Sequence, residues 1–280
     1  MSVLERMADV LSSTAMPVKM LTTQYRMHPN ICRFVSAHFY NKRLETDESR
    51  ALACAPAARE RPEPPIVWRT HGGRESRAEH STSTENREEA RIICGEILPA
   101  LFADPHYAGK KIVIITMYKA QLRLLEQMFT EHQHTGKAAV MTVDSAQGSE
   151  ADIVILSLVR SNAQRHIGFA RDRQRINVAL SRAKDCLLIV GNAQCFESDR
   201  VWRDLWRAAS QEGGGGAVGY CRADVRRGGF SGAGSHKANK KNVEPSSATA
   251  SWVATETLRN AGGVGREMIE TEEAVQTVGG

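Results

Sequence analysis

The sequence contains no apolar run that approaches the roughly 20 residues needed to span a bilayer. Residues 1–20 lack the apolar core of a signal peptide and carry the acidic residues Glu5 and Asp9. The six cysteines include no C-x-x-C pair and no Cys/His cluster with zinc spacing. These absences argue against secretion and membrane insertion. They predict a cytoplasmic or nuclear protein with reduced thiols and no metal site of its own.

Glycine is scarce in the first three quarters of the chain: residues 1–209 hold 8 of the 22 glycines, and residues 210–280 hold the other 14. The net charge of +5 lies entirely in residues 1–209, because residues 210–280 carry eight basic and eight acidic residues. We therefore predict one folded domain over 1–209, whose charge favours a polyanionic partner, and a Gly/Ser-rich, disordered tail over 210–280.

Within 1–209, short β-branched runs alternate with longer helical patterns. Continuous apolar runs are typical of strands that helices cover on both faces. The predicted strands are Ile112–Thr116, Ala139–Val143, Ile153–Val159 and Leu187–Gly191, with a shorter candidate at Val18–Leu21. One predicted helix begins at Pro29, and four others cover 85–103, 118–131, 173–184 and 197–209. This alternation predicts an α/β fold with a doubly wound, mostly parallel sheet. The Pro/Gly-rich segment 44–82 is predicted to be a surface insertion, interrupted by a strand at Ile66–Arg69.

Two segments carry residue types suited to nucleotides. In Gln24–Pro29, Tyr25 and Arg26 precede a helix, where an aromatic ring can stack on a base and a guanidinium can hold a phosphate. Their alternative is a packed ring and a surface charge. Thr142–Asp152 is a polar loop between two buried strands, with Gly148 open to a close phosphate approach and Thr142 and Ser145 able to bond phosphates. Its alternative is a simple connecting turn.

Two further segments adjoin predicted strands. On a helix, Arg171, Arg175 and Arg182 would fall near one face, which indicates either a phosphate site or a solvated basic face. Thr116–Gln121 directly follows a buried strand, in the position of a ligand-facing loop.

In this order and spacing, these segments resemble the second RecA-like domain of superfamily 1B helicases, the group of the nonsense-mediated-decay helicase and senataxin. Gln24–Pro29 is similar to that family's motif IV region, Thr142–Asp152 to motif V and Arg175–Lys184 to motif VI, and Asn86 with Glu89-Ala90 matches a further family habit. Met117 replaces a proline and Ala146 an aromatic or methionine, which we expect to alter packing rather than chemistry.

The resemblance implies a RecA-like domain that binds ATP and single-stranded RNA or DNA. It implies that Tyr25 stacks on adenine, that Arg26 and Arg182 reach the γ-phosphate, with Arg182 as arginine finger, and that the Gly148 backbone approaches the nucleotide. Glu150 would hold the ribose. Thr116, Thr142 and Ser145 would contact the backbone of the single-stranded nucleic acid.

The sequence also lacks a G-x-x-x-x-G-K-[ST] loop and an acidic Mg²⁺ box, which the resemblance assigns to a first RecA-like domain. We therefore expect the C-terminal motor half of an ATP-dependent helicase, inactive alone, with Mg²⁺ ligands and the first domain supplied in cis or trans. The alternatives are a non-catalytic nucleic-acid-binding or partner-docking module derived from a helicase, and an unrelated α/β nucleotide-binding domain.

Overall fold

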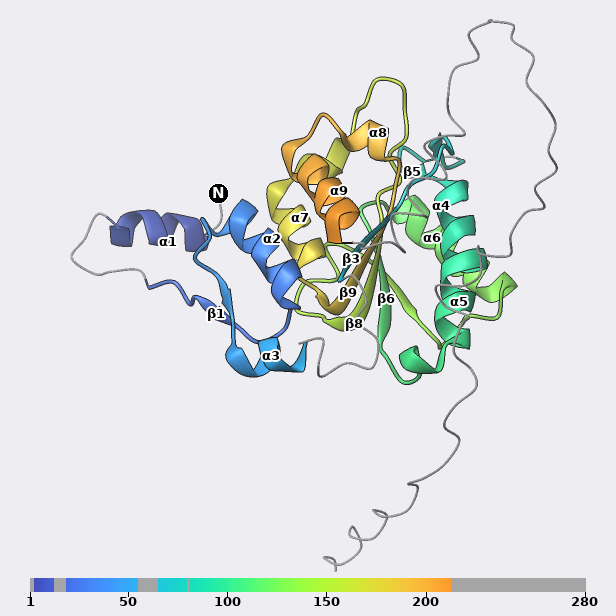
Figure 1. Ribbon diagram of the computed structural model, residues 1–280. Helices are drawn as coiled ribbons and strands as arrows, with labels where there is room; N and C mark the ends of the chain where they lie inside the picture. The colour runs from blue at the N-terminus through green and yellow to red at the C-terminus, as the bar shows by residue number, and fades with distance from the viewer. Residues whose placement is uncertain (1–2, 13–18, 55–64, 80, 213–280) are drawn as a thin grey trace, which may run out of the picture.

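The computed structural model describes residues 3–12, 19–54, 65–79 and 81–212 (Figure 1). Its centre is a five-stranded sheet in the order β3-β9-β8-β6-β7, in which every neighbouring pair is parallel. The strands are β3 (Ile66–Arg69), β6 (Ile112–Thr116), β7 (Ala139–Thr142), β8 (Ala151–Ser157) and β9 (Ala183–Val190). The predicted doubly wound α/β fold is therefore confirmed. The predicted tail, from residue 213 onward, lies outside the described residues.

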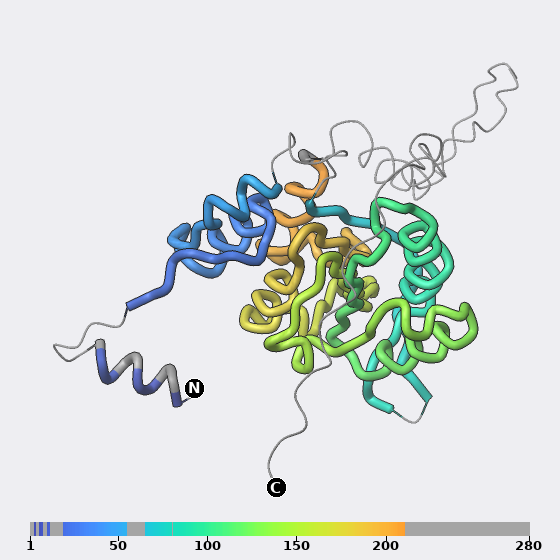
Figure 2. Tube along the Cα trace, turned by 90° about the horizontal axis from the view of Figure 1, so that it is seen from below, coloured from blue at the N-terminus to red at the C-terminus, as the bar shows by residue number. Residues whose placement is uncertain are grey.

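Helices cover both faces of the sheet, which explains the continuous apolar runs in its strands (Figure 1). One hydrophobic cluster joins the sheet to the helices of one face, α2 (Pro29–Phe39), α7 (Arg173–Leu180), α8 (Ala193–Phe196) and α9 (Arg200–Glu212). A second cluster joins it to the other face, α4 (Arg87–Ile92), a π-helical turn (Ile93–Ile97), α5 (Leu98–Ala103) and α6 (Lys119–Glu131). Figure 2 shows residues 19–54 in blue on one side of the molecule and the green helices of the second layer on the other.

The register places three hydroxyl-bearing residues side by side at one edge of the sheet. Thr116 ends β6 and is paired with Thr142 of β7 and with Ser157 of β8. Because all five strands are parallel, the segments that follow them leave from this carboxyl edge, and the segments that precede them arrive at the opposite, amino edge.

The loop between β7 and β8 connects these two edges. It leaves the carboxyl edge at Thr142 and reaches Ala151 at the amino edge, and it buries Val143 and Ala146 in the α2/α7 face of the core. Met117, the other departure from the family pattern, is buried in the same cluster. Both departures therefore lie in packed positions.

The segment 44–82 is more than a surface insertion. Its strand Ile66–Arg69 forms the edge strand β3 of the central sheet, and Ile66 and Trp68 are buried in the core. The segment also holds β2 (Glu45–Thr46), α3 (Glu48–Ala53) and β4 (Ser76–Arg77). Small strands pair outside the central sheet: β2 with β1 (Thr23–Gln24), and β4 with β5 (Thr84–Glu85).

Two element predictions need correction. Residues 19–21 form no strand, and Val18 lies outside the described residues. The predicted helix 173–184 ends at Leu180, because Ala183 and Lys184 already begin β9. No helix in the described part of the chain has the length and apolarity to cross a membrane.

Candidate nucleotide and strand sites

Tyr25 and Arg26 lie on a bend between β1 and α2 that the Gln24 side chain shapes. The Gln24 amide oxygen accepts hydrogen bonds from the backbone N–H groups of Arg26 (2.9 Å) and Met27 (2.7 Å). Met27 is buried, whereas Tyr25 is 68% exposed, so the bend anchors one side and presents the other to solvent. The predicted alternative, a packed Tyr25 ring, is thus not what the structure shows.

A cluster of cations surrounds one carboxylate at the amino edge of the sheet. Glu150, just before β8, lies 2.7 Å from the Arg26 guanidinium and 2.7 Å from the Lys184 ammonium at the start of β9. These bonds, from Lys184 first and Arg26 second, lower the pKa of Glu150 to about 2. Two cations share a single negative charge here.

Arg182 adds a third cation to this cluster. It is half-buried, and its guanidinium donates to the carbonyls of Val178 (3.0 Å) and Ser149 (3.2 Å) and to the Ser181 hydroxyl (2.9 Å). Desolvation, followed by the charge of Arg26, lowers the pKa of Arg182. Two arginines held within electrostatic reach of each other favour an anion between them.

The predicted convergence of Arg171, Arg175 and Arg182 is wrong, because helix α7 spans only 173–180. Arg171 lies in the 3₁₀ turn before the helix, and Arg182 lies beyond its end. Arg175 pairs instead with Asp144 at 2.9 Å. The arginine that joins Arg182 is Arg26, from a segment more than 150 residues away.

Arg50 of α3 fixes the backbone beneath the cation cluster. Its guanidinium donates to the carbonyls of Arg26 (2.9 Å) and Lys184 (2.8 Å) and to the carboxylate of Asp185 (2.7 Å). Lys110 bonds the second oxygen of Asp185 at 2.9 Å. Sequence reasoning missed Arg50, since nothing in its local pattern points to partners on a distant strand. It also left Lys184 without a role.

The predicted strand-contact residues lie at the carboxyl edge. The hydroxyls of Thr142 and Ser145 bond each other at 2.9 Å on the exposed start of the β7–β8 loop. Thr116 is 0% exposed, and its hydroxyl accepts the Tyr118 N–H at 3.4 Å, so this side chain does not reach the surface. The structure thus brings Thr142 and Ser145 together at the surface and leaves the Thr116 side chain buried on the neighbouring strand.

Gly148 and Glu150 lie at the other end of the same loop. Gly148 has φ +84°, a conformation that glycine adopts without strain, and the space around it is open. The loop therefore carries hydroxyls at one edge of the sheet and a salt-bridged carboxylate at the other.

Asn86 and Glu89 form a buried polar network behind the carboxyl edge. The Asn86 side chain accepts the Glu89 N–H and donates to the Val159 carbonyl at 3.1 Å. Both carboxylate oxygens of Glu89 accept the Val159 N–H at 2.9 Å, and one accepts the Ser157 hydroxyl at 2.6 Å. The His71 ring nitrogen Nε2 lies 3.0 Å from Glu89. In the described part of the chain, no group of three or more His, Cys, Asp or Glu side chains is arranged to hold a metal ion.

Comparison with known proteins points to one family. The AAA domain family matches residues 1–194. Helicase sen1 of Schizosaccharomyces pombe is 36% identical over 194 residues, 66% of this chain and 11% of that protein. The probable helicase senataxin of Homo sapiens is 35% identical over 202 residues, 71% of this chain and 7% of that protein. ATP-dependent helicase NAM7 of Saccharomyces cerevisiae is 34% identical over 205 residues, 70% and 21% respectively.

The chain thus spans between 7 and 21% of the length of these three relatives. The family match covers more than half of the chain and includes the three motif-like segments. The chain belongs to the AAA-domain family and is a superfamily 1B helicase-like domain of the senataxin and nonsense-mediated-decay type.

Proposed function

We propose that this chain is the second RecA-like domain of an ATP-dependent helicase, and that it forms one wall of an ATP site shared with a first RecA-like domain. The observation that carries this proposal is the pairing of Arg26 and Lys184 with the one carboxylate of Glu150, with Arg182 within electrostatic reach of both Arg26 and Glu150. Three positive charges against one negative charge leave an excess of two, which suits a polyphosphate.

The residues of this cluster fit ATP. Tyr25 offers an exposed ring on which adenine would stack, one residue before Arg26. Arg26 and Arg182 would meet the γ-phosphate, with Arg182 neutralising the charge that develops during transfer. Glu150 would release a cation and hold the ribose, while the open backbone at Gly148 would face the nucleotide.

Mg²⁺ enters this proposal with the first domain. The Glu150 carboxylate already pairs with the side chains of Arg26 and Lys184, so it is not placed as a metal ligand. The lysine and the acidic metal ligands that phosphoryl transfer requires belong to the P-loop half of such motors. The cation cluster lies at the amino edge, opposite the proposed nucleic-acid contacts at the carboxyl edge. A module that only bound nucleic acid at the carboxyl edge would have no use for arginines placed to meet a γ-phosphate, which favours the motor over that alternative.

Single-stranded RNA or DNA is the proposed second ligand, at the carboxyl edge. Thr142 and Ser145 would bond its phosphates, and the buried Thr116 on the neighbouring strand would support Thr142 through the β6–β7 pairing. The β7–β8 loop joins these hydroxyls to Glu150. Closure of the ATP site would therefore move the hydroxyls that contact the single-stranded nucleic acid through one short segment.

The test is strand-stimulated ATP hydrolysis by this chain alone and by the chain joined to a first RecA-like domain that carries a P-loop. We expect no turnover by the chain alone. In the joined protein we expect turnover that Arg182→Ala lowers by at least about 10³-fold, as for other arginine fingers. Arg182→Lys should rescue little, because lysine lacks the guanidinium fork.

The control is Arg200→Ala, which removes an arginine whose side chain is 82% exposed and which pairs with Asp204 on helix α9. It should leave turnover unchanged. Hydrolysis by the chain alone that Arg182→Ala abolishes would refute the need for a first domain. Unchanged turnover in the joined Arg182→Ala protein would refute the role of Arg182.

A further inference from the structure

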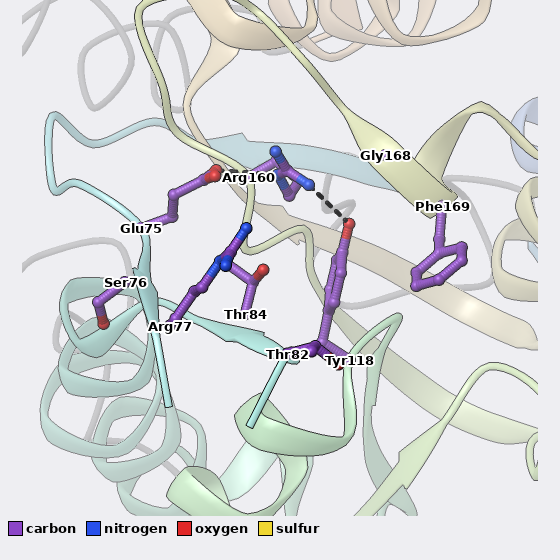
Figure 3. A pocket seen from close by; sticks show the side chains of 9 residues that line it. All are labelled: Glu75, Ser76, Arg77, Thr82, Thr84, Tyr118, Arg160, Gly168 and Phe169. Carbon is purple, nitrogen blue, oxygen red and sulfur yellow. Dashed lines mark hydrogen bonds and ion pairs between the residues drawn. The ribbon is translucent and has the colours of Figure 1, made fainter. Parts of the chain in front are cut away.

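A pocket of about 390 Å³ opens at the carboxyl edge of the sheet, away from the cation cluster of the amino edge (Figure 3). It lies among segments that follow β3, β6 and β8 and that precede α7. The residues that matter for its chemistry are two aromatic rings, two arginines and two hydroxyls: Tyr118, Phe169, Arg77, Arg160, Thr82 and Thr84.

Phe169 is an aromatic ring that the fold leaves open to solvent. It is 56% exposed, its centroid lies 5.6 Å from that of Tyr118, and the Arg175 guanidinium lies 5.2 Å from its centroid. An exposed ring beside a cation has the properties of a stacking platform for nucleobases, which bind to aromatic rings irrespective of sequence.

The backbone next to this ring fits tightly against the pocket wall. Gly168 has φ +54°, and a Cβ there would lie 2.5 Å from the Tyr118 hydroxyl and 2.7 Å from the Arg160 guanidinium. Figure 3 shows the Tyr118 hydroxyl directed at Arg160, with Phe169 projecting from the segment beside them. Glycine at 168 thus lets the chain pass close enough to place Phe169 over the pocket.

Arg160 is held by a strained turn. Val159, the residue before it, has φ +70°, which is a rare conformation for a β-branched side chain. The buried side chains of Glu89 and Asn86 bond the N–H and the carbonyl of Val159. Backbone strain that buried groups enforce in this way is typical of functional sites.

The charges of the pocket favour an anionic group, such as the phosphate of a nucleotide whose base stacks on Phe169. Arg160 is neutralised by Glu75, which it meets at 2.9 Å. Arg77, exposed on the β4–β5 hairpin, therefore gives the lining a net positive charge of one. The Thr82 and Thr84 side chains beside it supply hydroxyls of the kind that bond nucleic-acid phosphates.

Side-chain contacts link the pocket to the hydroxyls proposed to bind the single-stranded nucleic acid. Arg175 contacts Phe169 and also pairs with Asp144, the neighbour of Ser145. We propose that the pocket takes one nucleotide of the bound single strand, with its base stacked on Phe169 and its phosphate on Arg77. This inference rests on the proposed strand-binding function and adds a subsite to it.

The experiment measures the affinity of the full chain for a fluorescently labelled 12-nucleotide oligothymidylate by anisotropy, and for a 12-unit strand in which every base is missing. We expect Phe169→Ala to weaken binding to oligothymidylate by about tenfold, within the range of one stacked base. Phe169→Trp should restore it. Phe169→Ala should leave binding to the abasic strand unchanged.

Arg77→Ala should weaken binding to both strands alike and reduce the salt dependence by about one phosphate contact. The matched controls are Leu52→Ala, which removes another exposed apolar side chain, and Arg87→Ala, whose arginine is 80% exposed. Both controls should bind as the unaltered chain does. Thermal unfolding of each variant checks that it is folded.

The outcomes separate the two proposals. Unchanged affinity in Phe169→Ala, together with weaker binding by the Thr142→Ala/Ser145→Ala double variant, would overturn the subsite and leave the strand-binding function standing. Equal losses on the base-bearing and abasic strands would also overturn the stacking role. Failure of the unaltered chain to bind either strand would overturn the proposed function itself.

Discussion

Replacement of the buried carboxylate of Glu89 tests whether the network behind the carboxyl edge holds the fold together. Glu89 is 0% exposed and accepts hydrogen bonds from the backbone of Val159 and from Ser157. His71 completes the set: its Nδ1 accepts the Gly73 N–H, so its Nε2 carries the proton that faces Glu89. Three donors therefore converge on one side chain.

Glu89→Ala leaves two of these donors without an acceptor, since the Ser157 hydroxyl can rotate away. An orphaned buried donor costs about 1–3 kcal/mol, and removal of the side chain adds a cavity. Release of a buried carboxylate from its desolvation offsets part of this loss. We expect a net destabilisation of about 4 kcal/mol, which corresponds to a fall of about 12 °C in Tm for a domain of this size.

Glu89→Gln separates the loss of charge from the loss of acceptors. Its amide oxygen can still accept from Val159 and His71, and its NH₂ group can donate to Ser157, whose oxygen already accepts from Gln121 at 3.1 Å. Two charge-assisted bonds become neutral ones, at a cost of about 1–2 kcal/mol, or about 5 °C.

The assay is thermal unfolding followed by circular dichroism, with Glu88→Gln as the matched control on the same helix. Glu88 pairs with Arg91 at the surface, where an ion pair contributes at most about 1 kcal/mol. A fall in Glu89→Ala no larger than that of Glu88→Gln would refute the argument that the network supports the fold. Equal falls in Glu89→Gln and Glu89→Ala would show that charge, rather than the number of acceptors, carries the effect.

Two further predictions concern the glycine of the pocket and the acid limb of stability. Gly168→Ala should destabilise the fold by about 2 kcal/mol, because φ +54° is unfavourable for alanine and its Cβ would crowd Tyr118. Gly72 has open space around it, so Gly72→Ala should change the free energy of unfolding by no more than about 0.5 kcal/mol. Urea titration of both variants measures the difference. Burial opposes ionisation of Asp185, yet hydrogen bonds from Arg50 and Lys110 lower its pKa. Its stabilisation is thus full above the unfolded pKa of about 3.9 and is lost as the pH falls toward the lower folded value. The stability lost in Asp185→Asn should therefore shrink below about pH 4, and a loss that stays constant from pH 6 to pH 3 would contradict this assignment.

The sheet could be predicted from the sequence because its signal is local. The strands Ile66–Arg69 and Ile112–Thr116 begin and end where the apolar pattern indicates. The pattern could not show that Ile66–Arg69 pairs with β9, since that contact joins residues more than 100 positions apart. The helix predicted over 173–184 fails for a related reason: Ala183 and Lys184 suit a helix locally, but pairing with β8 draws Ala183 into a strand.

The site shows the same division between local and distant information. Tyr25 and Arg26 could be identified from a motif, because residues adjacent in sequence shape the bend that presents them. Arg50 could not be identified in this way, because its role is to donate to the backbone carbonyls of Arg26 and Lys184, which are distant in sequence. Its segment also reads as a Pro/Gly-rich insertion.

The parallel sheet separates the residues proposed to bind ATP from those proposed to bind single-stranded nucleic acid. The motif Thr142–Asp152 reads as one loop and suggests one site, yet its hydroxyls and its carboxylate lie at opposite edges of the sheet. Val143 and Ala146 are buried between them, so the middle of the loop is packed into the core. Beside this packed segment, Asp144 pairs with Arg175, and the Arg175 guanidinium lies over the ring of Phe169, so side-chain contacts link the loop to the proposed subsite. In the proposed motor, these contacts are the route by which a change at Glu150 would reach the bound single-stranded nucleic acid.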